Sequence, residues 1–263
     1  MTAVLQPPVV VKLGGAVLHD PDAVAAVWAG VAALGAPVVV VHGGGPQATA
    51  LARRLGHEPR VVAGRRVTTD LDLDVALWTM RGALNARLVA AARAAGVRAA
   101  GVSGVDGGLV TVEKRPPRDV DGETVDFGHV GDVVGCDPAL VTTLLAGGFV
   151  PVVAPLCADA SGRILNVNAD TVALMLAAAL GAAALLLVAE AGAVFRDLAD
   201  PASRLATLDA AGVAEGVAAG WIAGGMRPKL AAGFAALGCG VATVRICAPA
   251  TLADATAGTR LVP

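Results

Sequence analysis

The sequence predicts an α/β fold built around an open, mainly parallel β-sheet. Short uninterrupted runs of apolar, largely β-branched residues recur along the chain, as expected for strands buried on both faces of a parallel sheet. These runs occupy residues 9–13, 37–41, 149–153, 184–188 and 241–246. Helical patterns alternate with several of them, and such a rhythm predicts parallel strands with right-handed crossovers. The sequence contains no tandem repeat or low-complexity linker, so two lobes are expected to share one continuous sheet.

Three helices are expected near the start of the chain. A helix over residues 20–34 ends at Gly35, and a second over residues 46–55 ends at Gly56. Residues 68–70 (TTD) then open the longest helical pattern, which continues to about residue 95. The broad apolar face of this helix would suit either a subunit interface or an ordinary domain core, and the pattern leaves both open.

Strand and turn patterns follow the long helix. Residues 97–112 are expected to form strands, and the polar stretch 113–131 to form turns between short antiparallel strands, as in a flap over a site. The second half begins near residue 166. The remaining predicted elements are helices over residues 138–145 and 171–180, a loop over 190–204, helices through 218, and a helix ending at 237.

Residues 172–189 are uncharged and long enough to cross a membrane as one helix. Gly181 divides this stretch into a helix-length piece and a strand-length piece, and neither Trp nor Lys/Arg residues flank it. A buried helix that leads into a buried parallel strand is therefore expected, and no membrane span.

Composition argues for a protein that binds small molecules. The 263 residues suffice for one or two domains with a substantial core, and only 16% of them are charged, with a net charge of −2. No basic field is available to hold nucleic acid or a membrane surface. The four cysteines show no CxxC spacing and lie in apolar surroundings, so buried reduced thiols are expected rather than a zinc site. Residues 1–8 show no export signal, which predicts a cytoplasmic protein.

Two glycine-rich corners follow the first two strands. They are residues 11–15 (VKLGG) and residues 42–46 (HGGGP). Glycine pairs let backbone N–H groups approach an anion, and a helix N-terminus behind each corner would add a partial positive charge. Two neighbouring anion sites predict a transferase with two anionic ligands.

Lys12 is the first candidate for binding a phosphate. A lysine near the end of an apolar strand is costly to bury unless its charge is used, although a lysine that snorkels to solvent is the alternative. The corner is not a Walker A loop, because no GxxxxGK[ST] is present, and the sequence lacks a GxGxxG dinucleotide motif after the first strand.

Lys229, Asp170 and Arg66 are further candidates. Lys229 lies near the start of a helix, where a cation is unfavourable unless an anion is close, but a solvated lysine fits its position equally well. Asn166 and Asp170 precede a buried helix, and helix capping alone would explain them. An aspartate between two lysines would instead hold both in position. Arg66 can grip a carboxylate through two hydrogen bonds, or belong to a solvated basic loop over residues 60–66.

The sequence shows no Ser–His–Asp order, no HExxH motif and no paired carboxylates. A carboxylate that attacks a γ-phosphoryl group needs no general base, because the nucleophile is already ionised. Catalysis then depends on alignment and on neutralising the developing charge. Two lysines, an aspartate and glycine corners are sufficient for that chemistry.

These motifs together resemble the acetylglutamate kinases of the amino-acid kinase superfamily. The resemblance covers nearly the whole chain and rests on the order of residues 11–15 (VKLGG), 42–46 (HGGGP), 64–68 (GRRVT), 128–131 (GHVG), 166–170 (NVNAD), 225–229 (GMRPK) and 258–259 (GT). It implies a three-layer αβα sandwich, with residues 1–168 as an acetylglutamate-binding and dimerisation lobe and residues 169–263 as an ATP-binding lobe. It also implies transfer of the γ-phosphoryl group of MgATP to the side-chain carboxylate of N-acetyl-L-glutamate, in arginine biosynthesis.

The resemblance also implies roles for individual residues. Lys12 and Lys229 would stabilise the transferring phosphoryl group, and Asp170 would orient them. The ATP phosphates would bind at Gly14 and Gly15. The set implied to hold acetylglutamate is Gly44, Gly45, Arg66 and Asn166. Mg²⁺ would be carried mainly by the nucleotide.

Two features depart from the family pattern. Residues 189–193 read AEAGA, where the family usually has Ser/Thr-Asp-Val-x-Gly near the nucleotide. Arginine-inhibited members carry a helix before the first strand, and here only a short proline-containing segment precedes it. We therefore expect a homodimer that is insensitive to arginine.

Two other readings remain open from the sequence. A related kinase could act on a carrier-linked aminoadipate or glutamate in lysine biosynthesis, and residues 42–46 (HGGGP) favour acetylglutamate instead. A catalytically silent amino-acid sensor on the same fold is the other reading, and the atypical Glu190 motivates it.

Overall fold

A computed structural model describes residues 6–62, 65–120 and 122–263, and an eight-stranded sheet runs through its centre. The strand order is β14-β16-β15-β13-β1-β2-β10-β5. The strands are β1 (Val9–Leu13), β2 (Val38–His42), β5 (Ala99–Ser103), β10 (Val150–Ala154), β13 (Ala184–Val188), β14 (Thr207–Leu208), β15 (Thr243–Cys247) and β16 (Thr259–Leu261). All neighbours pair in parallel except β15 and β16, which confirms the predicted mainly parallel sheet. Strands β14 and β16 were not predicted, because they are too short to carry a hydrophobic pattern.

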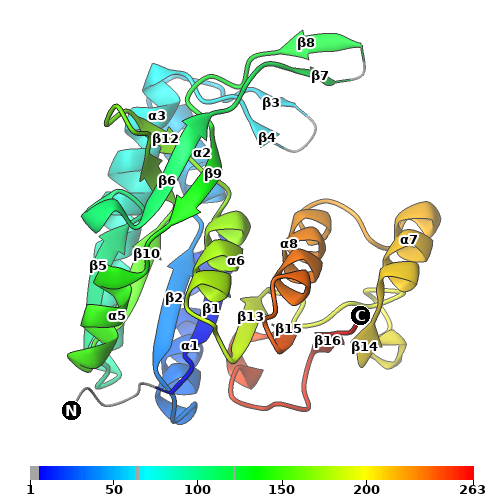
Figure 1. The fold of residues 1–263 in the computed structure, drawn as a ribbon. Helices are drawn as coiled ribbons and strands as arrows, with labels where there is room; N and C mark the ends of the chain where they lie inside the picture. Colours follow the sequence, from blue (N-terminus) through cyan, green and yellow to red (C-terminus); the bar gives the residue numbers. More distant parts are fainter. Residues whose placement is uncertain (1–5, 63–64, 121) are drawn as a thin grey trace.

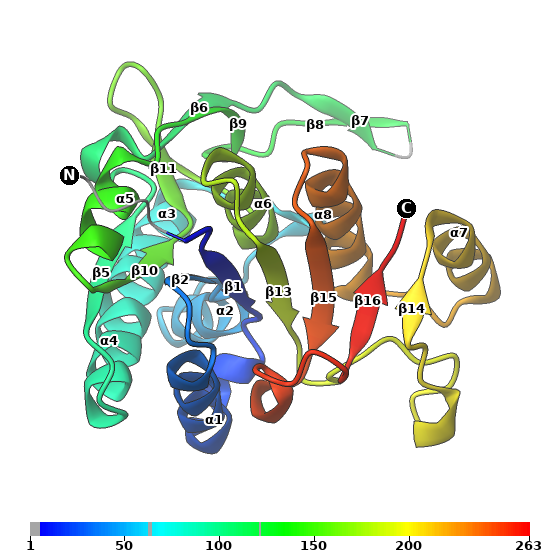
Figure 2. The same cartoon turned by 60° about the horizontal axis from the view of Figure 1, so that its bottom comes forward.

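Helices cover both faces of this sheet (Figures 1 and 2). The helices are α1 (Pro21–Ala33), α2 (Gly45–Arg54), α3 (Asp70–Ala76), α4 (Asn85–Ala94), α5 (Ala139–Ala146), α6 (Ala169–Ala179), α7 (Ala210–Ala219) and α8 (Met226–Gly238). Alternate strand residues point to opposite faces. Val10 therefore packs in the core beneath α6 and α8, whereas Val9 and Val11 pack in the core beneath α1 and α4. The predicted αβα sandwich is confirmed.

Smaller sheets lie on the half of the molecule that holds α3. Strands β12 (Ile164–Asn166), β11 (Leu156–Ala158), β6 (Val110–Lys114) and β9 (Gly131–Cys136) form a four-stranded sheet. Two further sheets are antiparallel pairs of strands. One joins β3 (Val61–Val62) with β4 (Arg65–Arg66), and the other joins β7 (Arg118–Val120) with β8 (Glu123–Val125). In both views the β7–β8 pair extends away from β6 and β9 toward the side that carries α8 (Figures 1 and 2).

The long helix predicted from residue 70 to about residue 95 is present, with one irregularity. Thr69 caps it, because its side chain accepts a hydrogen bond from the backbone of Asp72 while the Asp72 side chain accepts from Thr69. Between α3 and α4 the segment Leu77–Leu84 is a π-helix. A π segment changes which side chains face the sheet, and such segments are frequent at functional sites.

The apolar stretch 172–189 divides as the sequence predicts. It holds most of α6, a turn in which Gly181 has φ +55°, and then β13. Among the described residues, no helix is both long and apolar enough to cross a membrane.

The expectation of four buried cysteines is wrong in part. Cys157 and Cys247 are buried and Cys136 is half-buried, but Cys239 is exposed. Cys239 caps the end of α8, so its apolar neighbours in sequence do not cover it. Residues 1–5 of the N-terminal segment and residues 63–64 of the predicted basic loop, including Gly64 of the GRRVT motif, lie outside the described residues.

Candidate functional site

The two glycine corners lie side by side at the carboxyl ends of neighbouring strands. The chain moves from β1 to β2 on one side, and β13 pairs with β1 on the other. Ligands of open α/β sheets bind at such a switch point. Here the Gly14 N–H donates to the Val188 carbonyl at 3.3 Å, and the Gly43 N–H donates to the Leu13 carbonyl at 3.1 Å. Both corners therefore face one site.

Close packing explains why these corners are glycine. A Cβ on Gly15 would lie 2.6 Å from Cδ of Pro46, and one on Gly44 would lie 2.8 Å from side-chain carbons of Met80 and Leu84. The second corner leads directly into α2, as predicted. The first does not lead into an α-helix, because a short 3₁₀ turn, Val17–His19, comes before α1.

Lys12 forms a buried ion pair with Asp170. Lys12 shares a face of β1 with Val10, and that face packs against α6, where Asp170 lies in the first turn. The Lys12 Nζ and Asp170 Oδ1 are 2.7 Å apart, and the two side chains are 5% and 7% exposed. Asn168 caps α6 by accepting from the Asp170 N–H at 2.9 Å, so this helix begins at Ala169 rather than at residue 171.

Lys229 comes from α8 and lies at the same place. Its Nζ is 3.8 Å from the point that a Cβ on Gly14 would occupy. Burial lowers the pKa of Lys12 to about 8; the Asp170 carboxylate opposes this shift, and the neighbouring Lys229 ammonium adds to it. Two cations from distant parts of the chain thus meet around one carboxylate, next to a glycine corner.

A cavity of about 320 Å³ opens beside these charges. Asn166, Asp170 and Lys229 line it, together with Arg65, Arg66 and Arg115 from the strands and loops around β4 and β6. Four cations and one carboxylate line this cavity, which indicates a site for anionic ligands.

A backbone junction brings three of the sequence motifs to this cavity. The Thr68 N–H donates to the Phe127 carbonyl, and the His129 N–H donates to the Thr68 carbonyl at 2.8 Å. The Asn166 N–H in turn donates to the His129 carbonyl at 2.9 Å. Gly128 has φ +67°, and a Cβ there would lie 2.2 Å from the Thr68 carbonyl oxygen. Only glycine fits this crossing, which explains the GHVG motif.

Arg66 lies at the cavity, but its guanidinium is already engaged. Nη2 donates to the Gly45 carbonyl at 3.2 Å and to the Thr49 hydroxyl, and Nη1 lies 3.4 Å from the Asp72 carboxylate. Both two-pronged grips of a guanidinium use Nη2. The predicted bidentate hold on a carboxylate therefore requires Arg66 to release Gly45 or Thr49.

Sequence reasoning missed the pair His42 and Asn85. Asn85 Nδ2 donates to His42 Nε2 at 3.1 Å and to the Val152 carbonyl at 2.9 Å. His42 Nδ1 then donates to the Gly43 carbonyl at 2.8 Å, which assigns the neutral Nδ1–H tautomer. Burial lowers the pKa of His42 to about 4. The sequence did carry one signal for this pair, because Asn85 is a polar residue in the middle of the long helical pattern.

A second cavity, of about 420 Å³, lies beside the atypical AEAGA loop. Ala191, Val194, Phe195, Trp221 and Met226 are among its lining residues. The loop turns at Gly192, where φ is +74° and a Cβ would lie 2.8 Å from Cβ of Ala248. Glu190 is exposed. Met226 begins α8, so the same helix carries Lys229 and part of this cavity.

Known proteins resemble this chain over most of its length. The model of the "Amino acid kinase family" matches residues 7–248. The chain is 48% identical to an acetylglutamate kinase of Sorangium cellulosum (strain So ce56), over 91% of this chain and 86% of that protein. It is 45% identical to an acetylglutamate kinase of Anaeromyxobacter dehalogenans (strain 2CP-C), over 90% of each. The solved structure of smu.665 from Streptococcus mutans UA159 has the same fold, with a TM-score of 0.79, 24% identity and coverage of 97% and 98%.

Proposed function

The chain belongs to the amino acid kinase family, and we propose that its reaction takes place in the cavity lined by Asp170 and Lys229. It acts as an acetylglutamate kinase, which transfers the γ-phosphoryl group of ATP to the side-chain carboxylate of N-acetyl-L-glutamate and serves arginine biosynthesis. The convergence of Lys12, Asp170 and Lys229 from three separate elements is the observation that carries this assignment to the cavity.

In this proposal the two lysines act on the phosphoryl group while it moves. The acceptor carboxylate is already ionised, so no residue has to remove a proton from it. Lys12 and Lys229 neutralise the charge that develops on the phosphoryl oxygens, and such a preorganised cation is worth about 10²–10³ in rate. Asp170 holds the Lys12 ammonium in place and keeps it protonated inside the protein.

ATP with its Mg²⁺ enters as a substrate, and the glycine corner fits its phosphates. The Gly14 N–H already donates to the Val188 carbonyl, so Gly15 supplies the backbone N–H of this corner for a phosphate. Gly14 instead keeps space open, because a side chain there would lie next to the Lys229 ammonium. The cavity beside Trp221 and Phe195 is apolar enough for the nucleotide base. Both cavity residues belong to 169–263, which supports this part as the nucleotide lobe.

The acceptor would lie between the second glycine corner and β12. Gly44 and Gly45 form the start of α2, whose N-terminus favours a negative charge. Asn166 lines the cavity, and its amide donates to the Thr68 hydroxyl at 3.4 Å. Arg66 braces the corner through its bond to the Gly45 carbonyl. These residues support residues 1–168 as the acceptor lobe.

Trapping the acyl phosphate with hydroxylamine tests the activity directly. We expect hydroxamate formation with N-acetyl-L-glutamate and ATP, and little with free glutamate or aminoadipate. No hydroxamate with any acid would leave the silent sensor as the better reading.

Substitution of the two lysines tests their placement. Lys12→Ala and Lys229→Ala should each lower kcat by about 100-fold or more, because each removes a cation that acts in the transition state. Lys114→Ala is the matched control, since this exposed lysine pairs with Asp126 at 3.0 Å, outside the cavity. Equal activity of all three variants would contradict the assignment.

A further inference from the structure

Gln47 joins the two glycine corners. It lies in the first turn of α2, directly after the second corner, residues 42–46. Its Nε2 donates to the carbonyl of Gly15, in the first corner, at 2.9 Å, although the two residues are 32 positions apart in the chain. Pro46 packs against the same glycine, since its Cδ lies 2.6 Å from the point that a Cβ on Gly15 would occupy. The start of α2 therefore contacts the first corner and forms part of the second.

The first corner is held from both sides. The Gly14 N–H donates to the Val188 carbonyl, at the end of β13, and Gln47 holds the Gly15 carbonyl on the side of α2. The peptide group between Gly14 and Gly15 lies between these two bonds. Two consecutive glycines would otherwise sample many backbone conformations. Among the described residues nothing accepts a hydrogen bond from the Gly15 N–H, so this donor is free for a phosphate and its direction is restrained.

The Gln47 amide satisfies Gly15 at the expense of its own oxygen. Its Oε1 is shielded from solvent, and no donor in the described part of the chain reaches it. A buried oxygen without a donor costs free energy, whereas a glutamine that only covered the surface would keep both amide atoms in water. The reversed amide would place Oε1 against the Gly15 carbonyl oxygen, so the orientation with Nε2 as donor is the one that fits. The contact thus serves the position of the corner.

We propose that Gln47 is a positioning residue, which sets the distance between the nucleotide phosphates at the first corner and the acceptor at the second. This inference rests on the proposed function. In that reaction a carboxylate oxygen of the acceptor forms a bond to the γ-phosphorus, the bond from this phosphorus to the ADP oxygen breaks, and ADP keeps the electron pair. Gln47 exchanges no proton in this step. It acts through Gly15, because the spacing of the two corners determines how far the phosphoryl group has to move.

Gln47→Met tests this role, since methionine keeps the length of the side chain and removes the amide. We expect kcat to fall about tenfold or more, because a misplacement of about 1 Å can cost about 100-fold in rate. Each substrate still finds the contacts of its own corner. The dissociation constants of a non-hydrolysable ATP analogue and of N-acetyl-L-glutamate, each measured alone by calorimetry, should therefore stay within about threefold. A residue that served stability alone would change urea unfolding and leave kcat as it was.

Gln47→Glu is a second variant of the same shape. Its ionised carboxylate cannot donate to the Gly15 carbonyl and repels it, so kcat should fall at least as far as in Gln47→Met.

Arg54→Met is the matched control. Arg54 lies two turns further along α2 and lines the same groove as Gln47, together with Trp78, but it lies too far along the helix to reach Gly15. Its kcat should remain within about twofold of the unmodified protein. Sedimentation should give the same oligomeric state for all of these proteins.

Three outcomes would overturn this role. They are an unchanged kcat in Gln47→Met, a fall in kcat that Arg54→Met shares, which would place the effect in the groove, and a loss of affinity for one substrate as large as the loss in kcat. The last would make Gln47 part of the binding site of that substrate. If instead the unmodified protein forms no acyl phosphate from N-acetyl-L-glutamate, the proposed function fails, and this failure is seen without any variant.

Discussion

Lys12 is a buried cation whose protonation depends on its neighbours. Its pKa falls to about 8 because burial strips water from the ammonium and Lys229 repels it, while Asp170 acts in the opposite direction. The charged form binds phosphate, so the free protein loses this form as the pH rises through 8. Nucleotide phosphates favour the charged form, and the pKa should rise when ATP binds.

We therefore expect kcat/KM for ATP to fall above about pH 8, with the matching fall in kcat displaced to higher pH. Lys229→Met removes a repelling charge and should shift the alkaline fall in kcat/KM to higher pH. Asp170→Asn removes the attracting charge and should shift this fall to lower pH. pH–rate profiles of the three proteins supply the measurement. An alkaline limb at one pH in all three would show that another group is responsible.

His42 makes folding sensitive to acid. Its pKa is about 4 in the folded protein and 6.5 when unperturbed, because the buried ring has to remain neutral. Between these values the unfolded chain binds a proton that the folded chain does not, so stability is lost as the pH falls from 6.5 to 4. The loss amounts to up to about 3 kcal/mol.

Urea unfolding between pH 7 and pH 4 measures this loss, and the NMR signal of the His42 ring, assigned with a His42→Asn variant, reports the titration itself. We expect the ring to remain neutral down to about pH 4. A midpoint near 6.5 for this signal would contradict the assigned tautomer and its bond from Asn85.

At the scale of elements, α4 is fastened to the sheet through Asn85. Its amide bonds to carbonyls of β10 and β5 and to His42 at the end of β2, so one side chain ties three strands to one helix. This is possible only because Gly101, on β5, has no side chain. A Cβ there would lie 2.0 Å from Asn85 Oδ1.

Gly101→Ala should therefore destabilise the protein by about 1–3 kcal/mol, the usual cost of overpacking a core. It should also raise KM for the acceptor, because the Gly43 corner loses its support. Gly238→Ala is the control: it lies in α8 with open space around it and should be neutral or stabilising by up to about 1 kcal/mol. Urea unfolding and steady-state kinetics measure both effects. If Gly101→Ala were more stable than Gly238→Ala, the Asn85 side chain would have moved to make room for the added methyl group, and its close packing on Gly101 would not matter for stability.

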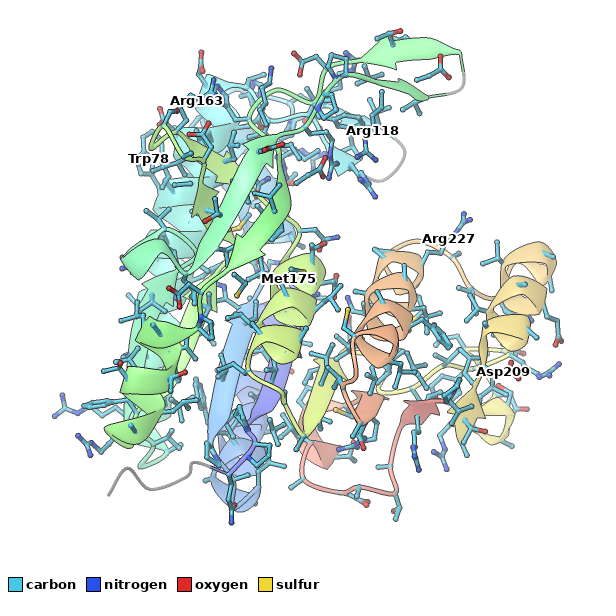
Figure 3. The ribbon with its side chains drawn as sticks, in the orientation of Figure 1. Trp78, Arg118, Arg163, Met175, Asp209 and Arg227 are labelled. Carbon is cyan, nitrogen blue, oxygen red and sulfur yellow. The ribbon has the colours of Figure 1, made fainter. Side chains whose placement is uncertain are left out.

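At the scale of the whole molecule, an exposed apolar surface supports the expected homodimer. Trp78, on the π segment and labelled in Figure 3, is 54% exposed. Together with Leu51 of α2 it lines a groove. Exposed aromatic side chains over such grooves are enriched at subunit interfaces.

We expect sedimentation to show a dimer, and Trp78→Asp to yield monomers, because a charge would be buried at the interface. Val134→Asp, at a residue of similar exposure on β9, should leave the dimer intact. Hexamers, or inhibition by arginine in the millimolar range, would contradict the predicted arginine-insensitive dimer.

The sequence by itself determined the architecture and the identity of the main charged residues. The strand 184–188 was predicted to the residue, and the apolar stretch 172–189 was correctly divided at Gly181. These features depend on local patterns, since a strand buried on both faces must be apolar and a turn with positive φ favours glycine. Lys12 was found because a charge in an apolar strand is unusual, and Lys229 because a cation near a helix start is unfavourable. Asp170 became a candidate only beside these two lysines, since helix capping alone would explain it.

Only the tertiary structure decided how these residues act on one another. It placed the Lys229 ammonium beside the corner at Gly14, occupied Arg66 with Gly45 and Thr49, and paired both Arg115 and Arg118 with Asp132. The physical reason is that hydrogen bonds and charge interactions act over a few ångströms in space, between residues such as Gly14 and Lys229 that the chain separates by more than two hundred positions. No local pattern records such a distance, and the packing of α6 and α8 on the sheet creates it.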